Sequence, residues 1–128
     1  KRMRSASHGM TDTIEIKINA AIEYMRENYR EDISRENLSA AIDLHPDNFS
    51  RYFKKYTGKK YNEYLTDLRI TEAMRLLRES DDSIITIAMN VGFGTLRNFN
   101  YAFFSVTGRT PREFRKSFHA PGGGKDTP

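Results

Sequence analysis

IAMNVGFGTLRNFNYAFFSVTGRTPREF, residues Ile87–Phe114, is the most informative stretch of this 128-residue chain. It contains a short apolar segment, a glycine-containing turn, a second amphipathic segment and a Thr-Gly stop, an order that is typical of a helix-turn-helix. A looser copy, LSAAIDLHPDNFSRYFKKYTGKKYNEY, occupies Leu38–Tyr64, about fifty residues upstream. The sequence therefore predicts an all-α chain in which one helical structure is used twice.

The two copies agree where a helical core and its stops are expected. From Phe49 and Phe99 onward they are offset by fifty residues, and their Thr-Gly stops coincide. Before the turn the offset is forty-nine, which pairs Leu38 with Ile87, so the second turn has one extra residue. Because the outward positions differ between the copies, one scaffold is expected to present two different surfaces.

Seven helices are predicted from apolar spacing and capping residues. Ser34 is an expected N-cap, Pro46 suits a first helical position, and Gly58 suits a helix end. Thr110 and Glu113 have the spacing of a capping box. The predicted helices are approximately residues 12–29, 35–43, 46–56, 61–79, 84–91, 96–107 and 111–117.

These helices predict two small subdomains and a linker between them. Residues 11–60 form the first helix-turn-helix subdomain and residues 81–118 the second, joined by a long linking helix within residues 61–80. At about 1.5 Å per residue, the nineteen residues of that helix span about 28 Å. Residues 1–10, which look like a linker, and the tail 119–128 are expected to be disordered.

The second helix of each copy has an inner face at the spacing i, i+3, i+4, i+7. The predicted inward residues are Phe49, Tyr52, Phe53 and Tyr56 in the first copy and Phe99, Ala102, Phe103 and Val106 in the second. In the short helix before the first turn, the predicted apolar face is Leu38, Ala41 and Ile42. Phe104 falls on the outer face although it is large and apolar. It is expected to pack against the linking helix, with a thymine methyl group or a protein partner as alternatives.

The composition argues against several classes of protein. The chain has no cysteine, and its three histidines share no helical face at metal-ligand spacing, so neither a metal site nor a cofactor is expected. Nothing in the sequence fixes a nucleophile beside a base, so an enzyme is not expected. No apolar run reaches the length of a transmembrane helix, and the basic start lacks an apolar signal region. The protein is therefore expected to be soluble and cytoplasmic.

Positive charge is concentrated in the two copies. The net charge is +4 and the pI is about 9.4. Five cations and one acid lie within residues 47–60, and five cations and one acid lie within residues 97–116. Each of these segments therefore carries +4, and the rest of the chain carries −4. This clustering favours a polyanionic partner more strongly than the total charge does.

The residues resemble the DNA-binding domain of the AraC/XylS family of transcription regulators. The resemblance covers about Ile14–Phe118. It rests on the order and spacing of Ile87-Ala88, Val91-Gly92-Phe93, Phe99, Phe103, Thr107-Gly108, Thr110-Pro111 and Phe114-Arg115. It implies seven helices, two helix-turn-helix subdomains joined by a long helix, and binding of double-stranded DNA with each second helix in a major groove. RNA polymerase and a covalently linked sensing domain outside this chain are the other implied partners, and no membrane is involved.

The resemblance also implies which residues of the first recognition helix contact DNA. Asp47, Ser50 and Arg51 would face the bases. Arg51 is the strongest of them, because its guanidinium can bond guanine O6 and N7 together, which is worth about 1–3 kcal/mol of discrimination. Asp47 either accepts from a cytosine amino group or only favours the helix dipole. The phosphate candidates, with simple solvation as the alternative, are Lys54, Lys55 and Lys59.

In the second recognition helix, the implied base contacts are Leu96, Arg97, Asn100 and Tyr101, and the implied phosphate contacts are Asn98 and Arg109. Arg97 and Asn100 have the chemistry for guanine and adenine respectively. Tyr101 and Phe104 depart from the family pattern, which often has Arg and Lys at these positions. Since this outer face has fewer cations, the first copy is expected to supply most of the affinity. The alternative function is a helical protein-interaction module with Tyr101 and Phe104 in its surface.

Overall fold

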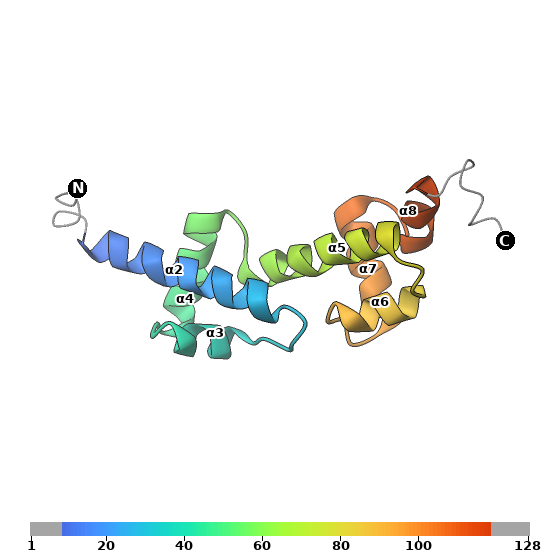
Figure 1. The fold of residues 1–128 in the computed structure, drawn as a ribbon. Helices are drawn as coiled ribbons and strands as arrows, with labels where there is room; N and C mark the ends of the chain where they lie inside the picture. The colour runs from blue at the N-terminus through green and yellow to red at the C-terminus, as the bar shows by residue number, and fades with distance from the viewer. Residues whose placement is uncertain (1–8, 119–128) are drawn as a thin grey trace. The chain divides into compact units, whose positions relative to one another are not determined.

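The computed structural model describes residues 9–118, with side chains from residue 13 onward. Within these residues the fold is all-α, as predicted, with seven helices and no strand (Figure 1). The helices are α2 (Gly9–Asn28), α3 (Arg35–Ala41), α4 (Pro46–Thr57), α5 (Tyr61–Glu79), α6 (Ile84–Asn90), α7 (Leu96–Thr107) and α8 (Pro111–Phe118). A helix able to span a bilayer is not found in this part of the chain. Residues 1–8 and 119–128, predicted to be disordered, lie outside the described residues, whereas Gly9 and Met10, predicted to be linker, belong to α2.

The contacts divide the chain into two units that meet between Leu65 and Thr66, inside α5. The first unit contains α2, α3, α4 and the beginning of α5, and the second contains the rest of α5 with α6, α7 and α8. The helix that was predicted to link two subdomains is therefore part of both units.

The core of the first unit is supplied by α2, α3 and α4, which pack against one another. Its buried apolar residues are Ile18, Ala21, Met25, Ile33, Leu38, Ile42, Phe49, Phe53 and Leu65. The ring centroids of Phe49 and Phe53 are 5.5 Å apart, and Phe53 meets Tyr64 of α5 edge-on at 5.5 Å. The buried residues of α2, Ile18, Ala21 and Met25, thus belong to the face that packs against the helix pair α3 and α4.

The core of the second unit repeats this arrangement. Its buried residues are Ile70, Ala73, Leu77, Ile87, Ala88, Val91, Phe99 and Phe103. Phe103 meets Phe114 of α8 edge-on at 5.5 Å, which reproduces the contact between Phe53 and Tyr64 fifty residues earlier. Ile70, Ala73 and Leu77 are the contribution of α5 to this core, and all three are fully buried.

The capping residues hold the helix ends as the sequence predicts. The hydroxyls of Ser34, Ser83 and Thr95 each accept a hydrogen bond from the backbone N–H three residues later. Gly58 and Gly108 end α4 and α7 in the left-handed conformation, with φ of 84° and 78°. Thr110 and Glu113 exchange both hydrogen bonds of a capping box, at 3.0 and 3.1 Å. The starts and stops of the repeat are therefore set by local sequence.

Several side chains lie differently from the prediction. Val106, predicted to face inward, is 45% exposed, because it lies in the last turn of α7, beyond the turns that carry the core phenylalanines. On α3, Ala41 is exposed and Ser39 is buried in the core instead. The expectation that the linking helix covers Phe104 is wrong, since 56% of this residue is exposed.

Candidate nucleic-acid interface

The first turn of α4 is fixed by a cap and by two core residues. His45 is the N-cap, and its Nδ1 accepts a hydrogen bond from the N–H of Asp47 at 3.1 Å. Pro46 occupies the first helical position, where its missing N–H leaves no donor unsatisfied. Phe49 and Phe53 are fully buried on the opposite side of the helix. This anchoring turns the polar side of α4 outward.

The outward side of α4 lines a cationic cleft of about 800 Å³. The cleft is lined by Arg35, Asp47, Ser50, Arg51, Lys54, Lys55, Lys60, Tyr61 and Asn62. Five of these residues are cations and one is an acid, so the cleft is suited to an anion such as a nucleic-acid phosphate. Among the described side chains, no group of three or more His, Asp or Glu is arranged to hold a metal ion.

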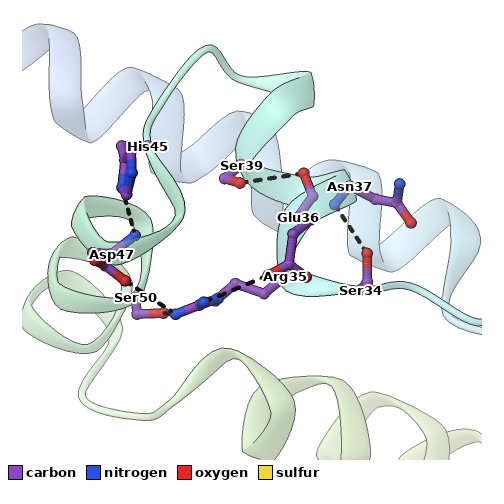
Figure 2. Close-up of polar contacts among 8 residues, drawn as sticks. All are labelled: Ser34, Arg35, Glu36, Asn37, Ser39, His45, Asp47 and Ser50. Atoms are coloured by element: carbon purple, nitrogen blue, oxygen red, sulfur yellow. Dashed lines mark hydrogen bonds and ion pairs between the residues drawn. The ribbon is translucent and has the colours of Figure 1, made fainter.

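The three predicted base contacts of α4 already have partners within the protein. Arg51 donates from Nη2 to Asn48 Oδ1 at 2.6 Å, and its guanidinium lies 5.1 Å from the ring centroid of Tyr52. Asp47 and Ser50 are both approached by Arg35, which comes from the start of α3 (Figure 2). The structure therefore brings Asp47, Ser50 and Arg51 together on one exposed turn and adds Arg35 to them.

Four residues of this cleft were not singled out from the sequence, namely Arg35, Lys60, Tyr61 and Asn62, and Arg35 is the one that contacts the predicted base contacts. It lies on a different helix, twelve residues before Asp47, and no helical periodicity connects the two. A signal is present in the repeat, where Ile84 corresponds to Arg35 and Arg97 corresponds to Asp47. The cation and the acid are thus both missing from the second copy, as expected for a pair.

The predicted phosphate contacts occupy exposed positions around these helices. Lys54 and Lys55 are exposed on α4, and Lys55 Nζ lies 5.8 Å from the ring centroid of Tyr56. Lys59 and Arg109 follow the two helix stops in the same way. Their backbone N–H groups donate to the hydroxyls of the preceding threonines, Thr57 and Thr107, at 3.1 Å in both copies. Their side chains therefore leave the scaffold from equivalent points.

The outer face of α7 is less cationic than that of α4. Arg97, Asn98, Asn100 and Tyr101 are exposed, and Tyr101 is 77% exposed. Leu96 differs from the prediction of an outward residue, because it is half-buried and packs against the second core. Arg97 is thus the one cation within α7.

One cation of the second charged segment has a structural role. Arg115 of α8 donates from Nε to the carbonyl oxygen of Leu77 and from Nη2 to that of Ser80, both at 3.1 Å. These bonds tie α8 to the end of α5 within the second unit. Of the five cations within residues 97–116, Arg115 is therefore engaged within the protein, and fewer cations are available to a ligand than the sequence indicates.

Known proteins are similar to this chain in sequence and in fold. A family model described as a helix-turn-helix domain matches residues 38–117. The chain is 33% identical over 101 residues to YobQ of Bacillus subtilis, an uncharacterized HTH-type transcriptional regulator. It is 32% identical over 115 residues to the HTH-type transcriptional activator RhaS of Escherichia fergusonii. These matches cover 79% and 90% of this chain and 42% and 41% of the relatives, so the chain spans about two fifths of their length.

Solved structures of regulators have the same arrangement of helices. The DNA-binding domain of AdpA, in complex with a target DNA, matches with a TM-score of 0.76 and 25% identity, over 80% of this chain and 92% of that one. A regulator from Chromobacterium violaceum with an AraC-type DNA-binding domain matches with a TM-score of 0.76 and 28% identity, over 84% and 96%. From its sequence and its fold, the chain therefore belongs to the AraC/XylS family of transcription regulators, and it carries the helix-turn-helix domain of that family.

Proposed function

We propose that this chain binds specific double-stranded DNA sequences as the DNA-binding domain of a transcription regulator, with α4 and α7 in successive major grooves. The observation that carries the proposal is the cationic cleft along the exposed side of α4, a helix that occupies the recognition position of a helix-turn-helix. The solved AdpA domain, which has the same fold, is in complex with a target DNA.

In α4, the proposed base contacts are Asp47, Ser50 and Arg51. Arg51 is exposed near the start of the helix, the part of a recognition helix that reaches base edges. A shift from its present partners, Asn48 and Tyr52, to a guanine would replace one hydrogen bond by two. Lys54, Lys55 and Lys59 are proposed to contact phosphates.

In α7, the proposed base contacts are Arg97, Asn100 and Tyr101, with Leu96 contributing only the exposed part of its side chain. Asn98 and Arg109 are proposed to contact phosphates. Because Arg97 is the one cation within α7, we propose that α4 supplies most of the affinity.

This ranking is tested with Arg51→Ala and Arg97→Ala on a duplex selected from random DNA. Arg51→Ala is expected to cost about 1–3 kcal/mol at a guanine position of the selected site, and Arg97→Ala is expected to cost less. Arg26→Ala is the matched control, because Arg26 is an exposed arginine of α2 that pairs with Glu23. A larger cost for Arg97→Ala than for Arg51→Ala would contradict the ranking.

The contribution of the phosphates is tested by titrating the same duplex at increasing salt. The four proposed phosphate-contacting cations, Lys54, Lys55, Lys59 and Arg109, predict a slope of log K against log salt of about −4. Affinity that does not change with salt would contradict binding through the phosphate backbone.

The proposal for the whole regulator extends beyond this chain. Since the curated relatives are longer, we propose that a sensing domain is covalently linked to this one and that the protein acts in the cytoplasm on promoters used by RNA polymerase. Co-purification of the full-length regulator with RNA polymerase on a selected duplex tests this part.

A second candidate function is protein binding through α7. Tyr101 and Phe104 lie three residues apart on one helical face and are 77% and 56% exposed. Selection of no sequence from random duplex DNA by the wild-type chain would favour this function over DNA binding.

A further inference from the structure

Arg35 reaches from the start of α3 to the first turn of α4 (Figure 2). Its Nη1 is 3.5 Å from Asp47 Oδ1 and 3.4 Å from Ser50 Oγ, so one guanidinium nitrogen lies between two proposed base contacts. We propose that Arg35 determines the base preference of α4, by setting the positions of the Asp47 carboxylate and the Ser50 hydroxyl. This inference rests on the proposed DNA-binding function.

The ion pair between Arg35 and Asp47 contributes little to the stability of the fold. The side chains of Arg35 and Asp47 are 35% and 79% exposed, and exposed ion pairs of this length have weak effects in water. The first turn of α4 is held without Arg35, since His45 caps it and Phe49 anchors it in the core. Arg35 on the outer side of this turn is therefore expected to affect the binding of a ligand there more than the stability of the fold.

A carboxylate on a surface that meets DNA requires a counter-charge. Phosphates repel Asp47, and this repulsion grows as the complex excludes water. Arg35 is shared between two acids, because its Nη1 is 3.5 Å from Asp47 Oδ1 and its Nη2 is 3.4 Å from Glu36 Oε2. It therefore offsets part of the negative charge of Asp47 and leaves Oδ2 as an acceptor for a base amino group such as cytosine N4. The Ser50 hydroxyl accepts from Arg35, so its own O–H can donate to a base acceptor. Arg35 thereby gives both side chains a defined role toward bases.

The second copy of the scaffold supports the pairing. The N-cap serines of α3 and α6 are equivalent, so Ile84 corresponds to Arg35, and Ile84 packs against the second core. Arg97 stands at the position of Asp47. The second copy therefore lacks both the acid at the start of its recognition helix α7 and the arginine at the start of the preceding helix α6.

The test uses the full chain and a library of random duplexes from which bound sequences are selected. At one position of one strand, the wild type is expected to prefer cytosine, whose N4 amino group can donate to the Asp47 carboxylate. Arg35→Gln is expected to reduce that preference by about fivefold or more. Lys54→Gln is the matched control, because it removes another cation of the same cleft. It is expected to weaken binding to all sequences alike and to lower the salt slope by about 0.9.

The decisive measurement is the effect of Asp47→Asn in two backgrounds. With Arg35 present, this substitution removes an oriented acceptor and is expected to lower affinity for the selected duplex. With Arg35→Gln, it removes an uncompensated negative charge and is expected to raise affinity. Equal effects in the two backgrounds, or a uniform loss in Arg35→Gln like that of Lys54→Gln, would overturn the proposal.

Arg35→Lys provides a second variant that keeps the cation. In this background Asp47→Asn is expected to lower affinity, as in the wild type, and a rise would contradict the role of charge. Circular dichroism of each variant verifies that it is folded. A wild type that selects no sequence would contradict the proposed function itself. A selective wild type with an unchanged preference in Arg35→Gln would contradict only the role of Arg35.

Discussion

Replacing Arg115 by methionine is expected to destabilise the second unit by about 2–3 kcal/mol. The guanidinium makes two part-buried hydrogen bonds of 3.1 Å to backbone carbonyls at the end of α5. Carbonyls in the last turn of a helix lack intrahelical partners, and a cation there also interacts favourably with the helix dipole. A hydrogen bond from a charged donor contributes about 1.5–3 kcal/mol, so two such bonds would contribute about 3–6 kcal/mol, and partial access of water reduces this to about 2–3 kcal/mol. Because methionine retains most of the aliphatic volume of arginine, the loss of stability measures the contribution of the two hydrogen bonds.

The matched control is Lys116→Met, because Lys116 is exposed on the same helix and also loses one charge. Urea unfolding is followed by circular dichroism, and hydrogen exchange of α5 and α8 amides assigns the loss to the second unit. For a unit of this size, the expected change lowers Tm by about 8–24 °C. A cost for Arg115→Met within about 0.5 kcal/mol of the control would refute the structural role. A lower salt slope of DNA binding in Arg115→Met would identify Arg115 as a phosphate contact instead.

Three further substitutions test the scaffold by urea unfolding. Phe103→Ala is expected to cost about 3–5 kcal/mol of stability, because the ring is fully buried. Phe104→Ala, at the exposed neighbouring residue, is expected to change stability by less than about 0.5 kcal/mol. Similar costs for the two substitutions would contradict the orientation of α7. Gly108→Ala is expected to cost about 1–2 kcal/mol from the left-handed backbone alone, because no atom lies within 4 Å of the added methyl group, and an unchanged unfolding free energy would contradict the cap. Ser39→Ala is expected to raise the free energy of unfolding by about 0.5 kcal/mol, because alanine has the higher helix propensity and the second copy has Ala88 at this position. The buried Ser39 hydroxyl makes one hydrogen bond, of 3.2 Å to Glu36 O. A loss of stability above about 1 kcal/mol would show that this hydrogen bond matters.

The helices and their ends could be predicted because they depend on residues close together in the chain. Ser34, Gly58, and the pair Thr110 and Glu113 act over at most four residues, and each has the expected partner in the structure. The all-α fold and the family membership follow from these local signals and from the repeat. Val106 was predicted wrongly because its spacing is that of a core residue, whereas its burial depends on what lies beside the last turn of α7.

The environments of the charged residues could not be predicted in the same way. The bonds of Arg115 join residues 35 and 38 positions apart, and Arg35 meets α4 across a turn, so no periodicity reveals either. Asp47 and Arg51 are exposed and Ser50 is half-buried on the same side of α4, which helical geometry alone predicts. Which bases these residues contact stays a prediction.

The shared helix α5 has a consequence for dissecting this protein into fragments. Leu65 is buried in the first unit, while Ile70, Ala73 and Leu77 form one wall of the second core. A fragment that starts at Ser80 would lack three fully buried side chains of its own core, and we expect it to be largely unfolded in isolation. A fragment beginning at Tyr61 would retain them. The chain can therefore be divided into its two units only within α5, near the boundary between Leu65 and Thr66, and not at either end of that helix.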